Sequence, residues 1–174
     1  MKKPDSLRAH LLAAIPQLRR SPDQLLIFID QGSARSTAAR GLSFEYRYTL
    51  NLMLTDFAGS PDAVFIPLLA WLGVHQHELL ASFEQNAEGI GFEVDVIDAG
   101  KVDLSITLPL TERVIVKRQP GGQLLVEYPQ EPQLEPFLPA GTWQVYSGAE
   151  LLAEWQSTEQ EGGDLAMPHP PRRG

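Results

Sequence analysis

Two histidines one residue apart, His75 and His77, are the residues of this chain best suited by type to bind a metal ion. With Glu78 beside them, they could activate a water molecule for hydrolysis if the two rings converged. On a helix the rings point about 200° apart, and only on a strand would they share a face. The other histidines, His10 and His169, lie far away in the sequence. We therefore interpret the pair as a solvated helix end and keep a small metal-dependent hydrolase as an alternative function.

Three aspartates and one glycine-rich tripeptide are further candidates for catalysis. Asp95, Asp98 and Asp103 surround one predicted hairpin, but their spacing matches no calcium-binding loop. Gly121–Gln123 matches the catalytic tripeptide of release factors in letters alone, because a Pro-Gly-Gly turn accounts for it. The chain contains neither a glycine-rich phosphate loop nor a nucleophile elbow. The sequence thus predicts a protein that is not an enzyme and has no cofactor or metal.

The composition sets the class of protein. With 43% hydrophobic and 21% charged residues, the 174-residue chain has the composition of a globular protein. It has no cysteine, which excludes disulfides, thiolate nucleophiles and cysteine-bound metals. The longest apolar run, Ala63–Val74, is too short to span a membrane and contains Pro67. The N-terminal residues lack the apolar core of a signal peptide, so we expect a soluble protein with no membrane partner.

Charge is distributed unevenly along the chain. The net charge is −8, which disfavours nucleic acid as a partner. Residues 1–47 carry eight Lys or Arg and four Asp or Glu, whereas residues 48–100 carry eight Asp or Glu and no Lys or Arg. This asymmetry suits head-to-tail contact between identical copies, although clustering on solvated faces explains it equally well. DNA lying against the basic first third is a further alternative, and its contact residues would be Lys2, Lys3, Arg8, Arg19 and Arg20.

Alternation over residues 42–55 is the clearest structural signal in the chain. Phe44, Tyr46 and Tyr48 begin an apolar face that continues to Leu54, while polar or charged residues occupy most of the other positions. This period of two predicts a strand, which at about 3.3 Å per residue would be roughly 40 Å long. A strand of that length either bends across the domain or projects toward a neighbouring molecule.

Helices and further strands are predicted on both sides of this strand. Helical periodicity begins at Pro4 and again at Asp62, where Pro67 should introduce a kink. An apolar run at 25–29 predicts a strand that ends at Gln31–Ser33. The order of elements indicates an α+β fold, with a mostly antiparallel sheet and two helices on one face. Four more strands are predicted near residues 92–97, 102–108, 114–116 and 124–126.

The last part of the chain is predicted to be an appendage. Residues 1–128 form the predicted α+β domain, and residues 129–141 carry four prolines and are predicted to be an extended linker. Residues 142–156 should form a small hairpin arm, which could not bury a core by itself. Residues 157–174 are rich in Glu, Gly and Pro and are predicted to be a disordered tail. Seven acidic and no basic residues between 129 and 171 make this extension an acidic arm.

Six short sequence strings occur in order over residues 3–128. They are Lys3–Arg8, Phe28–Asp30 with Gly32–Ser33, Leu42–Glu45 with Arg47–Asn51, Thr55–Phe57, Leu69–Leu72 and Leu110–Arg113. Together they resemble the tail completion protein R family of temperate contractile-tailed phages. The likeness continues more loosely from Gly148 to Trp155. Residues after Ser157 depart from it, so that tail has no assigned role.

The resemblance implies a virion structural protein of a phage tail, or of a headless phage-tail-like bacteriocin, assembled in the cytoplasm of the bacterial host. It implies a tail terminator, in which a ring of six copies caps the tail tube and sheath and offers a docking face to the head–tail connector. It implies no catalytic residues, and under this resemblance the DNA-contacting alternative is a head–tail connector. The long strand or the terminal arm could add an edge strand to a neighbouring copy or to the sheath. The residues predicted to form these interfaces are Phe44, Tyr46, Arg47, Tyr48, Asn51, Trp143, Tyr146 and Trp155.

Overall fold

The computed structural model describes residues 1–36, 41–81, 89–98, 100–131 and 138–158. The helices in this part of the chain are α1 (Lys3–Ala14), α2 (Pro16–Arg20), α3 (Asp62–His75) and α4 (Glu78–Ala81), with short 3-10 turns at Pro22–Gln24 and Pro120–Gly122. The strands are β1 (Leu25–Ser36), β2 (Phe44–Phe57), β3 (Gly91–Asp98), β4 (Lys101–Arg118), β5 (Leu124–Glu127), β6 (Gly141–Ser147) and β7 (Glu150–Ser157). The predicted α+β class is confirmed.

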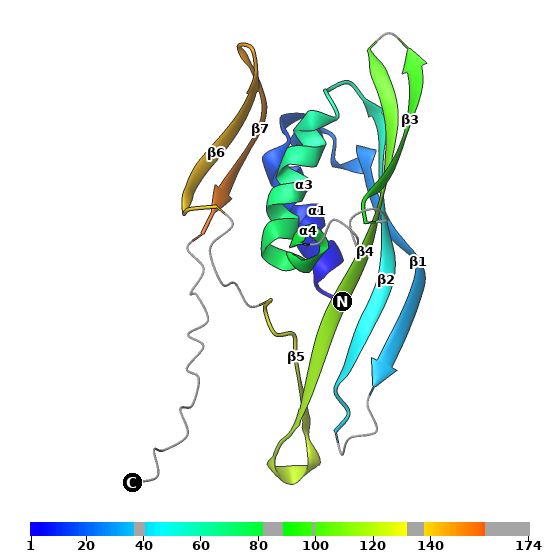
Figure 1. Ribbon diagram of the computed structural model, residues 1–174, viewed down its shortest axis with the longest axis vertical. Coiled ribbons are helices and arrows are strands. Elements are labelled where there is room, and N and C mark those ends of the chain that lie inside the picture. The colour runs from blue at the N-terminus through cyan, green and yellow to red at the C-terminus, as the bar shows by residue number, and fades with distance from the viewer. Residues whose placement is uncertain (37–40, 82–88, 99, 132–137, 159–174) are drawn as a thin grey trace.

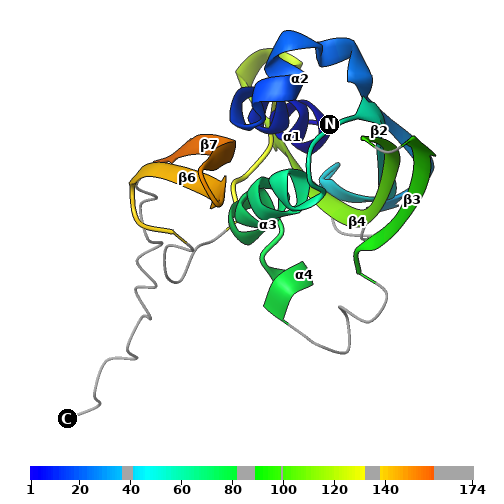
Figure 2. The same ribbon diagram turned by 90° about the horizontal axis from the view of Figure 1, so that it is seen from above.

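Two antiparallel sheets lie on opposite sides of a helical layer (Figure 1 and Figure 2). The larger sheet has the strand order β1-β2-β4-β3, and β5 pairs with the far end of β4. Helices α1 and α3 pack against one face of this sheet. The smaller sheet is the hairpin β6–β7, whose second strand contacts both helices from the other side.

The core forms where alternate residues of the central strands meet the apolar faces of the helices. β2 and β4 are in register from Phe44 opposite Val114 to Leu54 opposite Leu104, so their inward-facing side chains line up across the ladder. The predicted alternation of β2 is confirmed, because every second residue from Tyr48 to Leu54 is buried. The helical layer contributes the fully buried Leu7, Leu11, Leu18, Val64, Leu68 and Leu72.

Strand β4 is one continuous strand of 18 residues, so the prediction of two separate strands at 102–108 and 114–116 was wrong. Pro109 lies opposite Thr49 of β2, two residues beyond Thr107, the last residue of β4 that pairs with β3. A proline is tolerated there because no described strand occupies that edge of β4. Pairing with β2 carries the strand through the stretch in which the apolar alternation weakens.

Strand β1 also runs further than predicted, through Gly32 to Ser36, rather than ending at Gln31–Ser33. An irregularity between Ile29 and Gln31 absorbs one residue, and pairing with β2 resumes beyond it. Cross-strand pairing therefore outweighs the low strand propensity of glycine and serine. The ends of β1, β2 and β4 extend well beyond the helical layer (Figure 1).

Two predicted turns are confirmed. Asp98 pairs with Lys101 at the end of the β3–β4 hairpin, and Asp98 Oδ1 accepts a hydrogen bond from the Gly100 N–H at 2.9 Å. In the β4–β5 turn, Gly121 and Gly122 have φ angles of 79° and 80°, a conformation that glycine adopts without a steric penalty. The Asp98 hydrogen bond and the positive φ angles of the two glycines are what each turn requires, so turn geometry accounts for Asp98, Gly121 and Gly122.

The structure describes only part of the C-terminal region, residues 129–174, for which a linker, a hairpin and a tail were predicted. Residues 132–137 of the predicted linker and residues 159–174 of the predicted tail lie outside the described residues. Strand β7 lies on helices α1 and α3, with Ala153 fully buried and Leu152 and Trp155 half-buried against the core. The hairpin thus forms a third layer over the helices.

Candidate assembly surfaces and a groove beside strand β4

The five residues of β2 predicted to form an interface differ in what they expose. Phe44 and Tyr46 are half-buried, with their rings in edge-to-face contact at 4.8 Å between centroids. Arg47 is exposed and forms an ion pair with Glu45 at 2.7 Å. Tyr48 is only 5% exposed and belongs to the core.

Asn51 lies between two strands, because its side chain bonds to those of Asp30 in β1 and Thr107 in β4. The surface that Asn51 itself exposes is therefore limited.

The three predicted residues of the C-terminal hairpin lie on the opposite side of the helices from β2 (Figure 1). Tyr146 is 54% exposed. Trp143 is half-buried, and its indole N–H donates to Ser157 Oγ at 2.8 Å. Trp155 packs edge-on against His10 of α1, with 6.3 Å between ring centroids. The structure thus does not bring the strand set and the hairpin set together; they are two separate surfaces.

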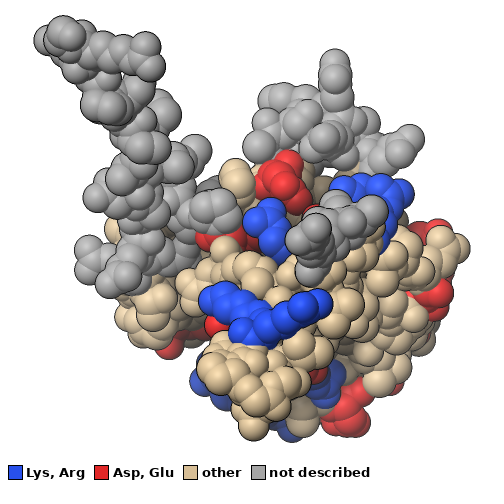
Figure 3. Space-filling model, turned by 90° about the horizontal axis from the view of Figure 1, so that it is seen from below, with Lys and Arg blue, Asp and Glu red and all other residues tan. Residues whose placement is uncertain are grey.

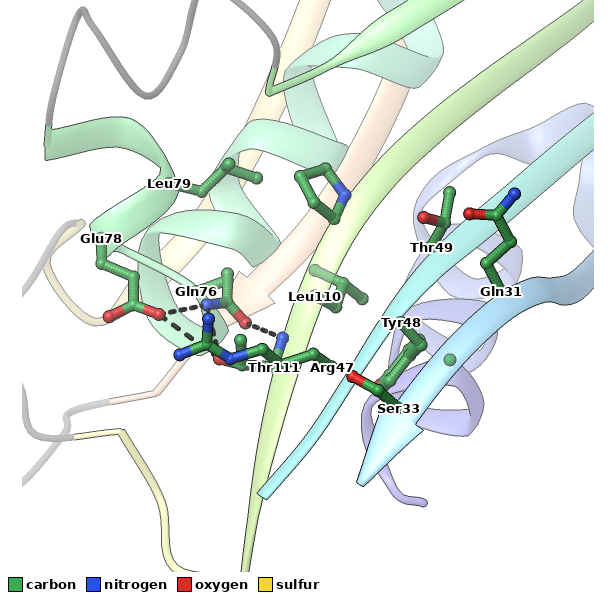
Figure 4. A pocket seen from close by; sticks show the side chains of 12 residues that line it. Gln31, Ser33, Arg47, Tyr48, Thr49, Gln76, Glu78, Leu79, Leu110 and Thr111 are labelled. Carbon is green, nitrogen blue, oxygen red and sulfur yellow. Dashed lines mark hydrogen bonds between the residues drawn. The ribbon is translucent and has the colours of Figure 1, made fainter. Parts of the chain in front are cut away.

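A groove of about 660 Å³ lies where the sheet passes the corner between α3 and α4 (Figure 4). Arg47 and Tyr48, two of the predicted interface residues, line this groove. Backbone and side chains of three strands and of the helical corner contribute to its wall. The lining residues are Gln31, Gly32, Ser33, Arg47, Tyr48, Thr49, Gln76, Glu78, Leu79, Pro109, Leu110 and Thr111.

Gln76 is the centre of the polar network in this groove, although it is only 3% exposed. Its carbonyl oxygen accepts from Lys3 Nζ at 2.8 Å and from the Thr111 N–H at 3.1 Å. Its amide nitrogen donates to Glu78 at 2.6 Å and to Thr111 Oγ1 at 3.0 Å. Gln76 therefore binds the free edge of β4 beyond the end of β3, and it joins that edge to the helical corner. Sequence reasoning missed Gln76, since a glutamine between two histidines carries no periodic signal.

Glu112 forms a second polar centre inside the domain, and sequence reasoning missed it too. The side chain is 4% exposed, and its oxygens accept from the N–H groups of Lys2 and Lys3 at 2.5 and 3.1 Å and from the Tyr48 hydroxyl at 3.2 Å. A carboxylate at this place satisfies N–H groups that the first turn of α1 leaves without helical partners. Burial, together with the negative charge of Glu112, raises the pKa of Tyr48. A signal was present, because Glu112 occupies an inward position in the alternation of β4 between Leu110 and Val114.

The two histidines His75 and His77 have different surroundings. His75 stacks on Trp71 with 4.6 Å between ring centroids, whereas His77 is exposed beyond the end of α3. Burial, followed by the positive charges of Lys3 and His10, lowers the pKa of His75 to about 4. Across the described ranges, no three His, Cys, Asp or Glu side chains are grouped closely enough to hold a metal ion.

Four of the five cations considered for DNA contact have a partner within the chain, and for Lys2 it is the ring of Tyr128, whose centroid is 6.0 Å from Nζ. Lys3 forms an ion pair with Glu131 at 2.9 Å in addition to its bond with Gln76. Arg8 donates to the carbonyl groups of Leu25 and Pro22, and Arg19 donates to the carbonyl of Ala13. These side chains hold the N-terminal helices, the start of β1 and the first residues of the predicted linker in place.

Both buried polar side chains of the described residues, Gln76 and Glu112, have hydrogen-bond partners within the chain, and comparison with known proteins decides the class of this protein. A family model, described as P2 phage tail completion protein R, matches residues 1–132. The chain belongs to this family. It is 40% identical to tail completion protein R of Escherichia phage P2 over 155 residues, which cover 89% of this chain and 99% of the phage P2 protein. No solved structure matches the chain.

Membership of the tail completion protein R family makes this chain a structural protein of the phage tail, with other tail components as partners. The resemblance read from six sequence strings is confirmed. The protein is not an enzyme, so the hydrolase alternative built on His75 and His77 is excluded by the family. No helix among the described residues combines the length and apolar character needed to cross a membrane.

Proposed function

We propose that six copies of this tail completion protein form a ring that caps the tail tube and sheath and presents a docking face to the head. The observation that carries the proposal is the extent of the similarity, which spans 99% of the phage P2 protein. The larger sheet adds physical support, because β3 and β5 lie at opposite ends of β4 and each has one side that no described strand pairs. Two free edges at opposite ends allow each copy to contact two neighbours, as a closed ring requires.

The two separate surfaces have different proposed roles in this assembly. Arg47 lines the groove, and the half-buried Phe44 and Tyr46 precede it on β2 toward the projecting end of the sheet; a tube or sheath segment would dock here. Tyr146 and Trp143 belong to the hairpin on the far side of the helices, which would contact a second tail component. The other three predicted residues support these surfaces from within. Tyr48 bonds to Glu112, and Asn51 bonds to Thr107. Trp155 packs against His10.

The direct test adds the purified full-length chain to unfinished tails of a phage P2 mutant that lacks its own tail completion protein R. Negative-stain electron microscopy should show a cap at one end of each tail, and native mass spectrometry of the released cap should give six copies. A chain that stays monomeric and leaves the tails unbound would contradict the proposal. Adding phage heads to the capped tails would show whether the capped end binds a head. A cap from a headless bacteriocin particle should bind none.

Removal of residues 130–174 tests the role of the hairpin surface. The truncated chain should retain cooperative unfolding, because the sheet–helix core lies in the remaining residues, but it should bind tails more weakly. A matched point variant is Tyr146→Ala, which removes an exposed ring and leaves the hairpin in place. Unfolding of the truncated chain, with normal tail binding by the point variant, would show that the hairpin stabilises the core and makes no contact.

A further inference from the structure

Strand β4 bears a hairpin at each end, and the first of them is acidic. We call β3 with residues Lys101–Ser105 of β4 the acidic hairpin. It carries the carboxylates of Glu93, Asp95, Asp98 and Asp103, and its one cation, Lys101, forms an ion pair with Asp56 at 3.5 Å. Asp95 lies directly opposite Asp103, an arrangement that destabilises a pair of strands. No described residue forms an ion pair with any of the four carboxylates, so cations from outside the chain would be stabilising here.

Apolar side chains are exposed on the same acidic hairpin. All eight residues of β3 are exposed, including Phe92 at 60% and Val96 at 74%. Phe92 contacts the ring of Phe65 on α3 at 5.3 Å, so the described helices reach only the beginning of this strand. The outer edge of β3 has no partner among the described strands. Such an edge, with uncovered valine and phenylalanine side chains, is a template for pairing with another chain.

The hairpin at the other end of β4 is basic. We call residues 113–127, which comprise the end of β4, the Pro120–Gly122 turn and β5, the basic hairpin. It carries the exposed cations Arg113, Lys117 and Arg118 and one acid, Glu127, which pairs with Lys117 at 2.6 Å. Figure 3 shows Lys and Arg side chains near the centre of this end of the molecule. The strand β5 is apolar and exposed at Leu124, Leu125 and Val126, and among the described strands it pairs with β4 alone.

The two hairpins cannot meet within one copy. Residues 102 and 116 of the same continuous strand are roughly 45 Å apart at about 3.3 Å per residue. Each hairpin combines an unpaired edge, exposed apolar side chains and a charge of the sign opposite to that of the other. The complementary partner of each is therefore the other hairpin of a second copy. A symmetric contact between two acidic hairpins would instead bring carboxylates together.

We propose that the acidic hairpin of one copy binds the basic hairpin of the next, with the edges of β3 and β5 adjacent. This contact rests on the proposed ring and names the surfaces that close it. It is heterologous, so each copy gives one surface and accepts the other, which generates a ring when the rotation closes. The groove beside β4 and the hairpin β6–β7 are left free for other tail components.

Cross-linking uses the absence of cysteine in the natural chain. The variant Val96→Cys with Leu125→Cys, treated with a short bis-maleimide, should give a ladder of dimers and larger species up to the closed ring, both free in solution and on capped tails. Each single variant alone should give no dimer. The matched control pairs Val96→Cys with Leu26→Cys, an equally exposed position on β1, and should give no ladder. Dimers from Val96→Cys alone, or equal ladders from both pairs, would overturn the proposal.

Charge reversal tests the same contact without a cross-linker. The acidic-hairpin variant is Glu93→Lys with Asp95→Lys, and the basic-hairpin variant is Arg113→Glu with Arg118→Glu. Each alone should weaken association by on the order of 10- to 100-fold, because rim attractions become repulsions. Mixing the two variants should restore rings, since each retains one natural surface and the reversed surfaces attract each other. Sedimentation velocity measures the result.

Controls separate this contact from the proposed function itself. Arg20→Glu with Arg35→Glu changes the charge equally at two exposed positions outside both hairpins and should leave ring formation unchanged. Tails that are capped normally by both hairpin variants would overturn the hairpin contact and leave the proposed cap intact. Tails that the natural chain itself fails to cap would overturn the proposed function.

Discussion

Helices α1 and α3 are covered by β-structure on two sides, and the two interfaces differ in chemistry (Figure 2). On the sheet side, alternate residues of β2 and β4 are fully buried, as are the leucines of both helices that face them. On the hairpin side, Ala153 alone is fully buried, while Leu152 and Trp155 are half-buried and the histidine His10 lies against the tryptophan. The sheet side is an apolar core, and the hairpin side is a smaller and more polar contact.

This difference indicates that the sheet side determines the fold and that the hairpin is a docked layer. Burial of apolar surface contributes about 25 cal/mol per Å², so the extensive leucine layer dominates the stability. The only buried carboxylate among the described residues, Glu112, also lies on the sheet side and holds the start of α1 there. Substitutions on the two sides should therefore have effects of different size.

The largest effect is expected from Leu52→Ala in the centre of β2. Leu52 is fully buried in the leucine layer, so the variant should lose about 2–5 kcal/mol of unfolding free energy through lost burial and the cavity left behind. Urea denaturation followed by circular dichroism measures the loss. Leu26→Ala, on the exposed face of β1, is the control and should change the free energy by less than about 1 kcal/mol. Similar losses in both variants would contradict the assignment of the core.

Glu112→Ala should have the next largest effect, at about 2–3 kcal/mol, because it leaves two backbone N–H groups and the Tyr48 hydroxyl without their acceptor. Tyr48→Phe removes one of these donors together with its bond and should cost about 1 kcal/mol. Hydrogen exchange of the first turn of α1 should speed up in Glu112→Ala and remain slow in Tyr48→Phe. Unchanged exchange in Glu112→Ala would show that this carboxylate does not hold the helix.

On the hairpin side, Trp155→Ala should cost only about 1–2 kcal/mol, since the ring is half-buried and the leucine layer remains intact. The fluorescence of the remaining tryptophans and the protease sensitivity of residues 141–157 would report release of the hairpin. Trp143→Ala, whose indole binds Ser157 within the hairpin, serves for comparison. A loss as large as that of Leu52→Ala would remove the distinction between the two sides.

The smallest effect concerns pH and belongs to the helical histidines. Burial lowers the pKa of His10, and burial with the charges of Lys3 and His10 lowers the pKa of His75 to about 4. Both are neutral in the folded protein at pH 7, and the unfolded chain binds protons more readily below its histidine pKa of about 6.5. Unfolding free energy should therefore fall as the pH decreases from about 6.5 toward 4. His75→Gln should show a shallower decline in urea denaturation at pH 7 and pH 5; an identical decline would assign the effect to other groups.

The sequence predicted the local features of the fold well. Alternation between Phe44 and Leu54 gave both the strand and its buried face, and the residues Asp98–Gly100 and Pro120–Gly122 gave the turns. The errors occurred where local propensity and tertiary pairing disagree. Gly32 and Ser33 lie inside β1, and Pro109 lies inside β4, because β2 offers a partner strand on one side of each.

The candidate surfaces were harder to predict than the fold. Aromatic residues in an alternating strand suggested an interface, but the same pattern places Tyr48 in the core, and only burial in the folded chain distinguishes the two outcomes. Gln76 and Glu112 gained their importance from partners that lie 35 and 110 residues away in the chain.

The sequence by itself determined the class of this protein, its family, its uneven charge and the period of its strands, because these depend on residue types and on near neighbours along the chain. Only the tertiary structure decided that one strand, β4, is continuous, and that it holds an acidic and a basic hairpin at opposite ends. It also decided that β7 lies on the helices. Such facts depend on which distant segments pair, and pairing depends on the burial that the whole chain achieves together.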